Sequence, residues 1–289
     1  MINKENIVIL NEEQLKRYQQ ELLKIVGDLV RVCDKEGLNY SLSGGSVIGA
    51  VRHKGIIPWD DDIDINMPRK SYERLLKIFD KELGDNYYIQ TPQTYPNLGI
   101  MVTQVREKGT IARRKYDWNT NPCGISIDIY IVENVFENRL KRMVQKNLSM
   151  ILAFIISSIR MLNNKEIPKE ISEIEAKPVK YSGLKIIVGK ILKKISLANW
   201  IKWLDKINGL CKNEKSTYVT IPTGRKHFNG EMQERSNLLQ YKKVPFENME
   251  LNIPKNYDSY LNNLYGDNYM KIPSKDKRES HVFLELRYK

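Results

Sequence analysis

Asp62 and Asp64 could bind a metal ion together. They stand two residues apart in an alternating segment, and side chains at this spacing on a strand point to the same face. Their carboxylates can converge on one hard divalent cation, whose charge removes the repulsion between them. Ile63 and Ile65 alternate with the aspartates and are expected to face a core. The pattern predicts a strand with a metal-binding polar face.

The neighbouring residues Asp60 and Asp61 have a simpler interpretation. Acidic clusters in loops usually lie in water, and a single D-x-D is common by chance. Asp128 strengthens the metal hypothesis, because it interrupts an otherwise apolar strand predicted over residues 125–132. A buried carboxylate without a metal or proton partner would be costly. We therefore expect Asp128 to join Asp62 and Asp64.

A glycine turn, Ser43-Gly44-Gly45-Ser46, precedes this segment. It separates a short strand predicted over 38–42 from a helix that begins near Val47. Backbone N–H groups of Gly44 and Gly45 and the Ser46 hydroxyl could hold a phosphate of a substrate there.

Three basic residues, Arg52, His53 and Lys54, follow the turn and are further candidates for phosphate binding. The alternative is that they cap a helix end or face solvent. Arg106, Arg113 and Arg114 are weaker candidates of the same kind.

Helices and strands alternate along the chain, which predicts an α+β fold with a mixed sheet flanked by helices. An amphipathic helix is expected over 11–36 with Asn11 as its cap, and another over 69–83 that buries Tyr72, Leu75, Leu76 and Phe79. Further elements are expected as strands over 87–90 and 100–106 and as a short helix over 257–265.

The middle of the chain is a basic helical insertion. Residues 139–206 hold 15 Lys and Arg against 5 Asp and Glu, which accounts for +10 of the net charge of +12. One basic block suggests a local partner rather than nucleic acid. The predicted division is a catalytic core over 1–138, the insertion over 139–206, and a C-terminal part over 207–289 that completes the catalytic domain.

The insertion has two interpretations. Its apolar run over 148–159 has 12 residues, short of the roughly 20 that span a bilayer, and residues 184–204 are amphipathic and Lys-rich. Such helices can bind an anionic membrane surface, or they can pack on the core and leave their lysines in water. The polar, proline-containing stretch 163–182 is expected to be a mobile connection between them.

Three cysteines at wide spacing support neither a disulfide framework nor a zinc site. The first residues show no secretory signal pattern. We therefore expect a cytoplasmic protein, with peripheral contact to the inner face of the membrane if the insertion binds lipid. The three histidines, His53, His227 and His281, lack any pairing that suggests zinc.

The segment from Gly45 to Ile65 closely resembles the signature of the LicD family, bacterial phosphorylcholine transferases related to the fukutin group. Residues 124–130 are similar to the second acidic strand of that family. Its C-terminal pattern is similar to Tyr265-Gly266-Asp267, Pro273, Arg278 and His281. The resemblance covers about residues 12–135 and 215–285 and leaves the basic insertion unmatched.

The resemblance implies a nucleotidyltransferase-like fold in which the glycine turn and three aspartates hold Mg²⁺, or Mn²⁺, and a CDP-alcohol. Asp62 and Asp64 would be metal ligands, and Asp128 a third ligand or the base for the acceptor hydroxyl. This chain departs from the family at Asn66, where a glycine is common, and at Tyr130, which replaces phenylalanine.

The implied reaction transfers phosphocholine, or a similar alcohol phosphate, from CDP-choline or a related donor. The acceptor would be a hydroxyl of teichoic acid, capsule or lipopolysaccharide, including a lipid-linked glycan. Two alternatives are transfer of a nucleotide to a small hydroxylated acceptor, and a non-catalytic peripheral membrane protein. The second alternative predicts loss of a metal ligand, whereas all three aspartates are present.

Overall fold

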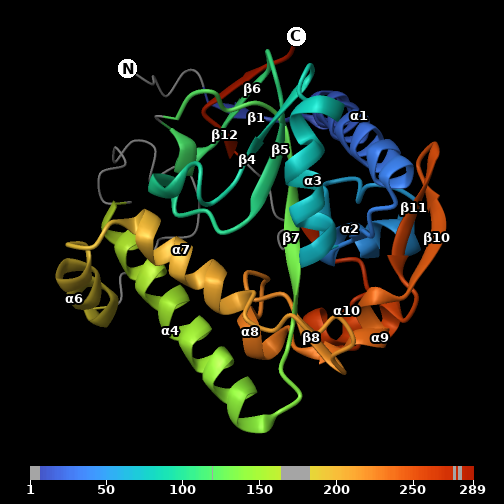
Figure 1. The fold of residues 1–289 in the computed structure, drawn as a ribbon. Coiled ribbons are helices and arrows are strands. Elements are labelled where there is room, and N and C mark those ends of the chain that lie inside the picture. The colour runs from blue at the N-terminus through green and yellow to red at the C-terminus, as the bar shows by residue number, and fades with distance from the viewer. Residues whose placement is uncertain (1–6, 119, 164–182, 276–277, 279–281) are drawn as a thin grey trace.

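A mixed seven-stranded sheet forms the centre of the computed structural model (Figure 1), which describes residues 7–118, 120–163, 183–275, 278 and 282–289. The strand order is β2-β3-β7-β5-β4, with β8 joined to β7 and β9 to β8. β3 and β7 are parallel, and the other neighbours are antiparallel. The sheet strands are β2 (Ser41–Leu42), β3 (Asp64–Pro68), β4 (Tyr87–Gln90), β5 (Thr103–Glu107), β7 (Ser126–Asn134), β8 (Tyr218–Thr220) and β9 (Gln233–Glu234).

Two long helices, α1 (Glu12–Glu36) and α3 (Arg69–Glu82), cover one face of this sheet. Tyr72 of α3 is hydrogen-bonded to Thr103 (2.7 Å), and Lys24 of α1 is paired with Glu107 (2.5 Å). Thr103 and Glu107 are four residues apart on β5, so they point to the same face of the sheet. Side chains of the opposite parity, such as that of Gln104, face away from both helices.

The predicted fold class and most predicted elements are confirmed. Asn11 caps α1 through a capping box with Gln14, since each side chain accepts a hydrogen bond from the backbone N–H of the other residue. The strand expected over 100–106 begins only at Thr103. The predicted burial of Leu76 is wrong, because the buried stripe of α3 is centred on Leu75 and Leu76 is 38% exposed.

The basic insertion forms helices α4 (Arg139–Asn163), α6 (Gly183–Leu192) and α7 (Leu197–Asn208). The predicted amphipathic piece over 184–204 is therefore two helices, and Ser196 caps the second. The predicted connection over 163–182 lies, except for its first residue, outside the described residues. A separate hydrophobic cluster joins α4 to α7 through Ile155, Ile156, Ile159, Leu197, Trp200, Ile201 and Leu204.

Residues after the insertion return to the main core. β8 pairs with β7, while β6 (Ile111–Arg113) pairs with β13 (Glu285–Arg287) and β1 (Val8–Ile9) with β12 (Val282–Phe283). Other elements are α2 (Gly44–Ile48), α8 (His227–Gly230), α9 (Arg235–Leu239), α10 (Tyr257–Tyr265) and the hairpin of β10 (Tyr241–Phe246) with β11 (Met249–Pro254). The division at residues 138 and 206 stays a prediction.

Candidate active site

The three predicted aspartates lie together near the N-terminal ends of the parallel strands β3 and β7. Asp64 is the first residue of β3, and its register partner on β7 is Asp128. Residues opposite each other on neighbouring strands point to the same face, so the two carboxylates are neighbours. Asp62 precedes the strand, contrary to the expectation that it lies on it, yet its charge acts on both other carboxylates.

The crowding of these carboxylates makes the site electronegative. Burial, followed by the charges of Asp62, Asp128 and Asp60, raises the pKa of Asp64 well above its ordinary value. Burial also raises the pKa of Asp128, although the hydrogen bond from Gln104 Nε2 to Asp128 Oδ1 (2.8 Å) opposes this shift. The same hydrogen bond places Asp128 on the sheet face opposite α1 and α3.

A hard divalent cation fits this set of ligands. All the candidate ligand atoms are carboxylate oxygens, which Mg²⁺ and Mn²⁺ prefer. Carboxylate oxygens of Asp60, Asp61 and Asp62 also lie within 4.8 Å of one another. A cation bound among Asp60, Asp62, Asp64 and Asp128 would relieve their mutual repulsion.

Asp61 is not the solvated loop residue that was expected. It is 4% exposed, and its Oδ2 lies 3.3 Å from Nη2 of Arg114, which also lies over the Phe283 ring. The charge of Arg114 opposes the raised pKa of Asp64 and of Asp128. Arg114 was a weak candidate for phosphate binding. Its guanidinium instead pairs with Asp61 and partly neutralises the acidic cluster.

The glycine turn is the start of α2 and is fixed by Tyr260 of α10. Tyr260 is buried, and its Oη accepts a hydrogen bond from Gly44 N (3.0 Å) and lies 3.1 Å from Ser43 Oγ. Asn66, one of the departures from the family, donates to the same oxygen at 3.3 Å. Gly44 has φ +45°, and a Cβ there would lie 3.0 Å from Tyr265 Oη. A side chain at this position would therefore be strained and crowded.

The predicted phosphate-binding groups of the turn are partly engaged by the protein itself. Ser46 Oγ accepts a hydrogen bond from Asp64 N (2.9 Å), so this hydroxyl holds the first residue of β3 in place. Ser46 N donates to Ser43 O, as Gly44 N does to Tyr260. Gly45 lines the cleft described below, where a Cβ would lie 3.6 Å from Asp60 Oδ2.

We predict that Tyr260→Phe destabilises the fold by about 1–3 kcal/mol and lowers turnover, because buried donors lose their acceptor. Urea unfolding and initial rates measure the two effects. The matched control is Tyr257→Phe on the same helix, whose ring keeps its place under the Lys242 ammonium (4.3 Å). Equal unfolding free energies for the two variants would contradict this role.

A cleft of about 350 Å³ is lined by carboxylates of the acidic cluster, although Asp128 is not among its lining residues. Its acidic residues Asp60, Asp62 and Asp64 come from one segment, whereas its cationic residues come from separate parts of the chain. The complete lining is Gly45, Ile48, Arg52, Ile57, Trp59, Asp60, Asp62, Asp64, Arg225, Tyr265, Asn268, Tyr269, Lys271, Pro273 and Arg278. The cationic side chains could bind the phosphates of a substrate. A metal ion on the acidic residues could neutralise part of the same phosphate charge.

Trp59 forms one wall of this cleft. Its ring lies 3.9 Å from the guanidinium carbon of Arg278 and 5.7 Å from that of Arg52. Arg225 lies over the Tyr265 ring at 5.4 Å. Stacking on these rings holds guanidinium groups at the rim of the cleft.

The three basic candidates after the turn have different environments. Arg52 lines the cleft and donates to Tyr269 O (3.3 Å) and, through Nε, to His53 Nε2 (2.9 Å). His53 lies edge-on to Trp59, and burial together with the charge of Arg52 lowers its pKa. Lys54 is exposed at φ 58°, where its N–H ends the π-helical turn Gly49–His53. Neither His53 nor Lys54 is among the residues that line the cleft.

Sequence reasoning missed Tyr260, Gln104 and Arg225, which carry no motif. Tyr130, named from the sequence only as a departure from the family, stands two residues after Asp128 on the same strand face. The charge of Asp64 is the largest cause that raises the pKa of Tyr130. Asp267 is exposed, and His281 lies outside the described residues.

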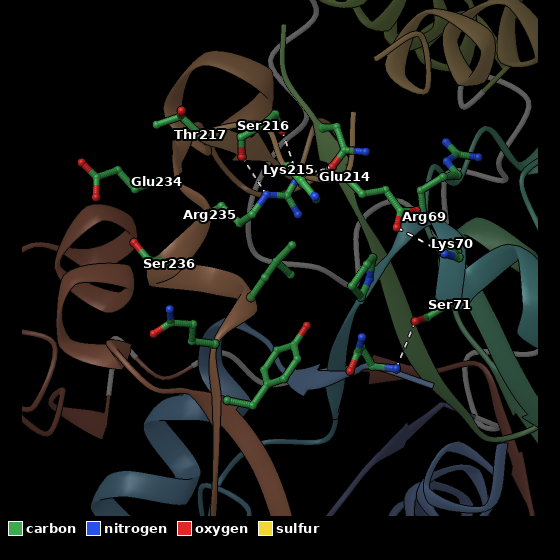
Figure 2. Close-up of a pocket in the computed structure, with 16 residues that line it drawn as sticks. Arg69, Lys70, Ser71, Glu214, Lys215, Ser216, Thr217, Glu234, Arg235 and Ser236 are labelled. Carbon is green, nitrogen blue, oxygen red and sulfur yellow. Dashed lines mark hydrogen bonds and ion pairs between the residues drawn. The ribbon is translucent and has the colours of Figure 1, made fainter. Parts of the chain in front are cut away.

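A larger pocket of about 540 Å³ lies at the other ends of β3 and β7 (Figure 2). Its carboxylates are Glu214, paired with Lys70 at 3.4 Å, and Glu234. Arg235 is held by Ser216 O (2.7 Å) and Asn134. Charges here come from separate elements and include no group of converging carboxylates, so the candidate catalytic site is the smaller cleft with its aspartates.

The mixed sheet, with paired aspartates beside a glycine turn, agrees with the nucleotidyltransferase-like fold that the resemblance implies. Residues 37–150 match the family described as LicD/FKTN/FKRP, nucleotidyltransferase domain. The part of the chain that holds the glycine turn and the three aspartates is therefore similar to the nucleotidyltransferase domain of the LicD family.

Two named relatives extend this comparison. The chain is 28% identical over 280 residues to the lipopolysaccharide cholinephosphotransferase LicD of Haemophilus influenzae, covering 94% of this chain and 97% of that protein. It is 49% identical over 39 residues to the human ribitol 5-phosphate transferase FKRP, covering 14% of this chain and 8% of that protein.

Proposed function

We propose that this protein is a metal-dependent phosphotransferase that moves phosphocholine, or a similar alcohol phosphate, from a CDP-activated donor to a hydroxyl of a cell-surface glycan. The observation that carries the proposal is the cleft in which Asp60, Asp62 and Asp64 face Arg52, Arg225, Lys271 and Arg278. The names of the LicD and FKRP relatives agree in the kind of group transferred.

Each side of the cleft has a distinct task in this proposal. Asp62 and Asp64 hold Mg²⁺ or Mn²⁺, and Asp128 is either a third ligand or the base that accepts the proton of the acceptor hydroxyl. When bound, the metal neutralises phosphate charge and lowers the pKa of a coordinated oxygen. Arg52, Arg225 and Arg278 bind the phosphates, because phosphoryl transfer depends on alignment and charge neutralisation.

The acceptor in this proposal is teichoic acid, capsule or lipopolysaccharide, free or lipid-linked. A cytoplasmic location agrees with the three buried, unpaired cysteines. Among the described residues, no helix combines the length and apolar character needed to cross a bilayer.

A donor panel tests the proposal directly. The protein is incubated with Mg²⁺, a surface glycan and, in turn, CDP-choline, CDP-ethanolamine, CDP-ribitol or CDP-glycerol, and CMP is measured. We expect CMP from one donor and loss of turnover when EDTA removes the metal. Pyrophosphate released from a nucleoside triphosphate would support nucleotide transfer instead, and turnover unaffected by EDTA would refute the metal requirement.

A further inference from the structure

Helices α4 and α6 expose large apolar side chains along one side each. We use the name apolar face for Leu140, Val144 and Ile151 of α4 together with Leu184, Ile187 and Ile191 of α6. These six side chains are between 51% and 68% exposed. Their spacings of three, four and seven residues place the members from each helix on a single stripe. α6 packs against α4 (Figure 1), and a Cβ at Gly189 would lie 2.6 Å from Ser158 O.

Another side of α4 is already used for packing. Gln145, Ser149, Ile156 and Ile159 are buried, and the two isoleucines join the cluster with α7. At 100° per residue the mean direction of these positions is about 115° around the helix from that of Val144 and Ile151. A helix that is apolar on both sides is stable in place only when both sides are covered. On the side of Val144 and Ile151, α6 covers α4 at Ser158, which is buried, whereas Leu140, Val144 and Ile151 remain more than half exposed.

The charges around the apolar face identify what covers it. α4 and α6 contain no Asp or Glu, and their basic residues include Arg139, Lys146 and Lys190. Lys193 and Lys194 follow α6 directly and are exposed. A second copy of the chain would bring like charges together, which opposes self-association. An anionic bilayer supplies both an apolar layer and negative charge.

We propose that the apolar face and its surrounding lysines bind the surface of an anionic membrane, with α4 and α6 lying in the interfacial layer. Each basic residue near such a surface strengthens binding by about fivefold, equivalent to about 1 kcal/mol. Apolar side chains add to this by entering the boundary between headgroups and acyl chains. The surface is separate from the cleft, so lipid binding does not depend on the proposed reaction.

Co-sedimentation of the full chain with vesicles tests the proposal. One set of vesicles is pure phosphatidylcholine, and the other contains equal parts phosphatidylcholine and phosphatidylglycerol. We expect binding to the anionic vesicles that weakens with salt, and little binding to the neutral ones. The charge-reversal variant Lys190→Glu/Lys194→Glu should bind the anionic vesicles at least about tenfold more weakly.

Matched variants separate a local surface from general effects. Lys16→Glu/Lys77→Glu makes the same charge change on exposed residues of α1 and α3 and should keep most of the binding. Ile151→Glu should weaken binding more than Ile9→Glu, whose isoleucine is 67% exposed on β1. Circular dichroism checks that each variant is folded.

Three results would overturn the proposal: no salt-sensitive binding of the wild type, equal losses in test and control variants, or self-association through this face without vesicle binding.

Discussion

Asp64→Asn should lower turnover by on the order of a thousandfold while raising the melting temperature of the metal-free protein. Loss of a metal ligand removes several kcal/mol of charge stabilisation from the transition state. The metal-free fold becomes more stable, because burial and the charges of Asp62, Asp128 and Asp60 disfavour the ionised Asp64 carboxylate. The substitution keeps the hydrogen bond to Ser46, because Ser46 Oγ accepts it from the backbone N–H of residue 64 and not from the Asp64 side chain.

Metal-dependent stabilisation provides the second measurement. A ligand at a hundredfold excess over its Kd stabilises the native state by about 2.7 kcal/mol. Thermal unfolding with and without Mg²⁺ should show this gain for the wild type and a much smaller gain for Asp64→Asn. Asp80→Asn, an exposed position on α3, is the control and should retain activity and the metal effect. A lowered melting temperature for Asp64→Asn would indicate a structural role instead.

The acidic cluster could be predicted from sequence because each of its parts has a local signal. Asp62 and Asp64 share a segment, and an isolated carboxylate in the apolar strand marked Asp128. Asp64 and Asp128 are brought together because β3 and β7 are parallel neighbours in the sheet. The spacing of the residues in the sequence does not determine this pairing.

The support of this cluster could not be predicted in the same way. Tyr260 bonds to Gly44 from 216 residues away, and Arg225 reaches the cleft from the loop after β8. No local pattern distinguishes such a tyrosine or arginine from those that face solvent. Asp61 was misjudged for the same reason, because its partner Arg114 is 53 residues distant.

One long-range cluster of charges has a larger expected effect on stability than any in the cleft. Arg69, the first residue of α3, is hydrogen-bonded to Glu133 of β7 and to Asp205 of α7 (2.8 Å). The Glu133 side chain is 3% exposed, and burial raises its pKa while the Arg69 hydrogen bond lowers it. Arg69 thus joins the sheet to the basic insertion and neutralises a buried carboxylate.

Arg69→Ala should therefore lower the free energy of unfolding by about 3–5 kcal/mol, measured by urea denaturation, because Glu133 becomes a buried charge without compensation. The adjacent Lys70→Ala is the control, since the Lys70–Glu214 pair is 79% and 54% exposed and such pairs contribute about 0–1 kcal/mol. The double variant Arg69→Met/Glu133→Gln should regain most of the loss, because it removes the buried charge along with its partner. If Arg69→Ala and Lys70→Ala unfold alike, then the ion pairs of Arg69 add little, and the apolar cluster with α4 holds α7 in place.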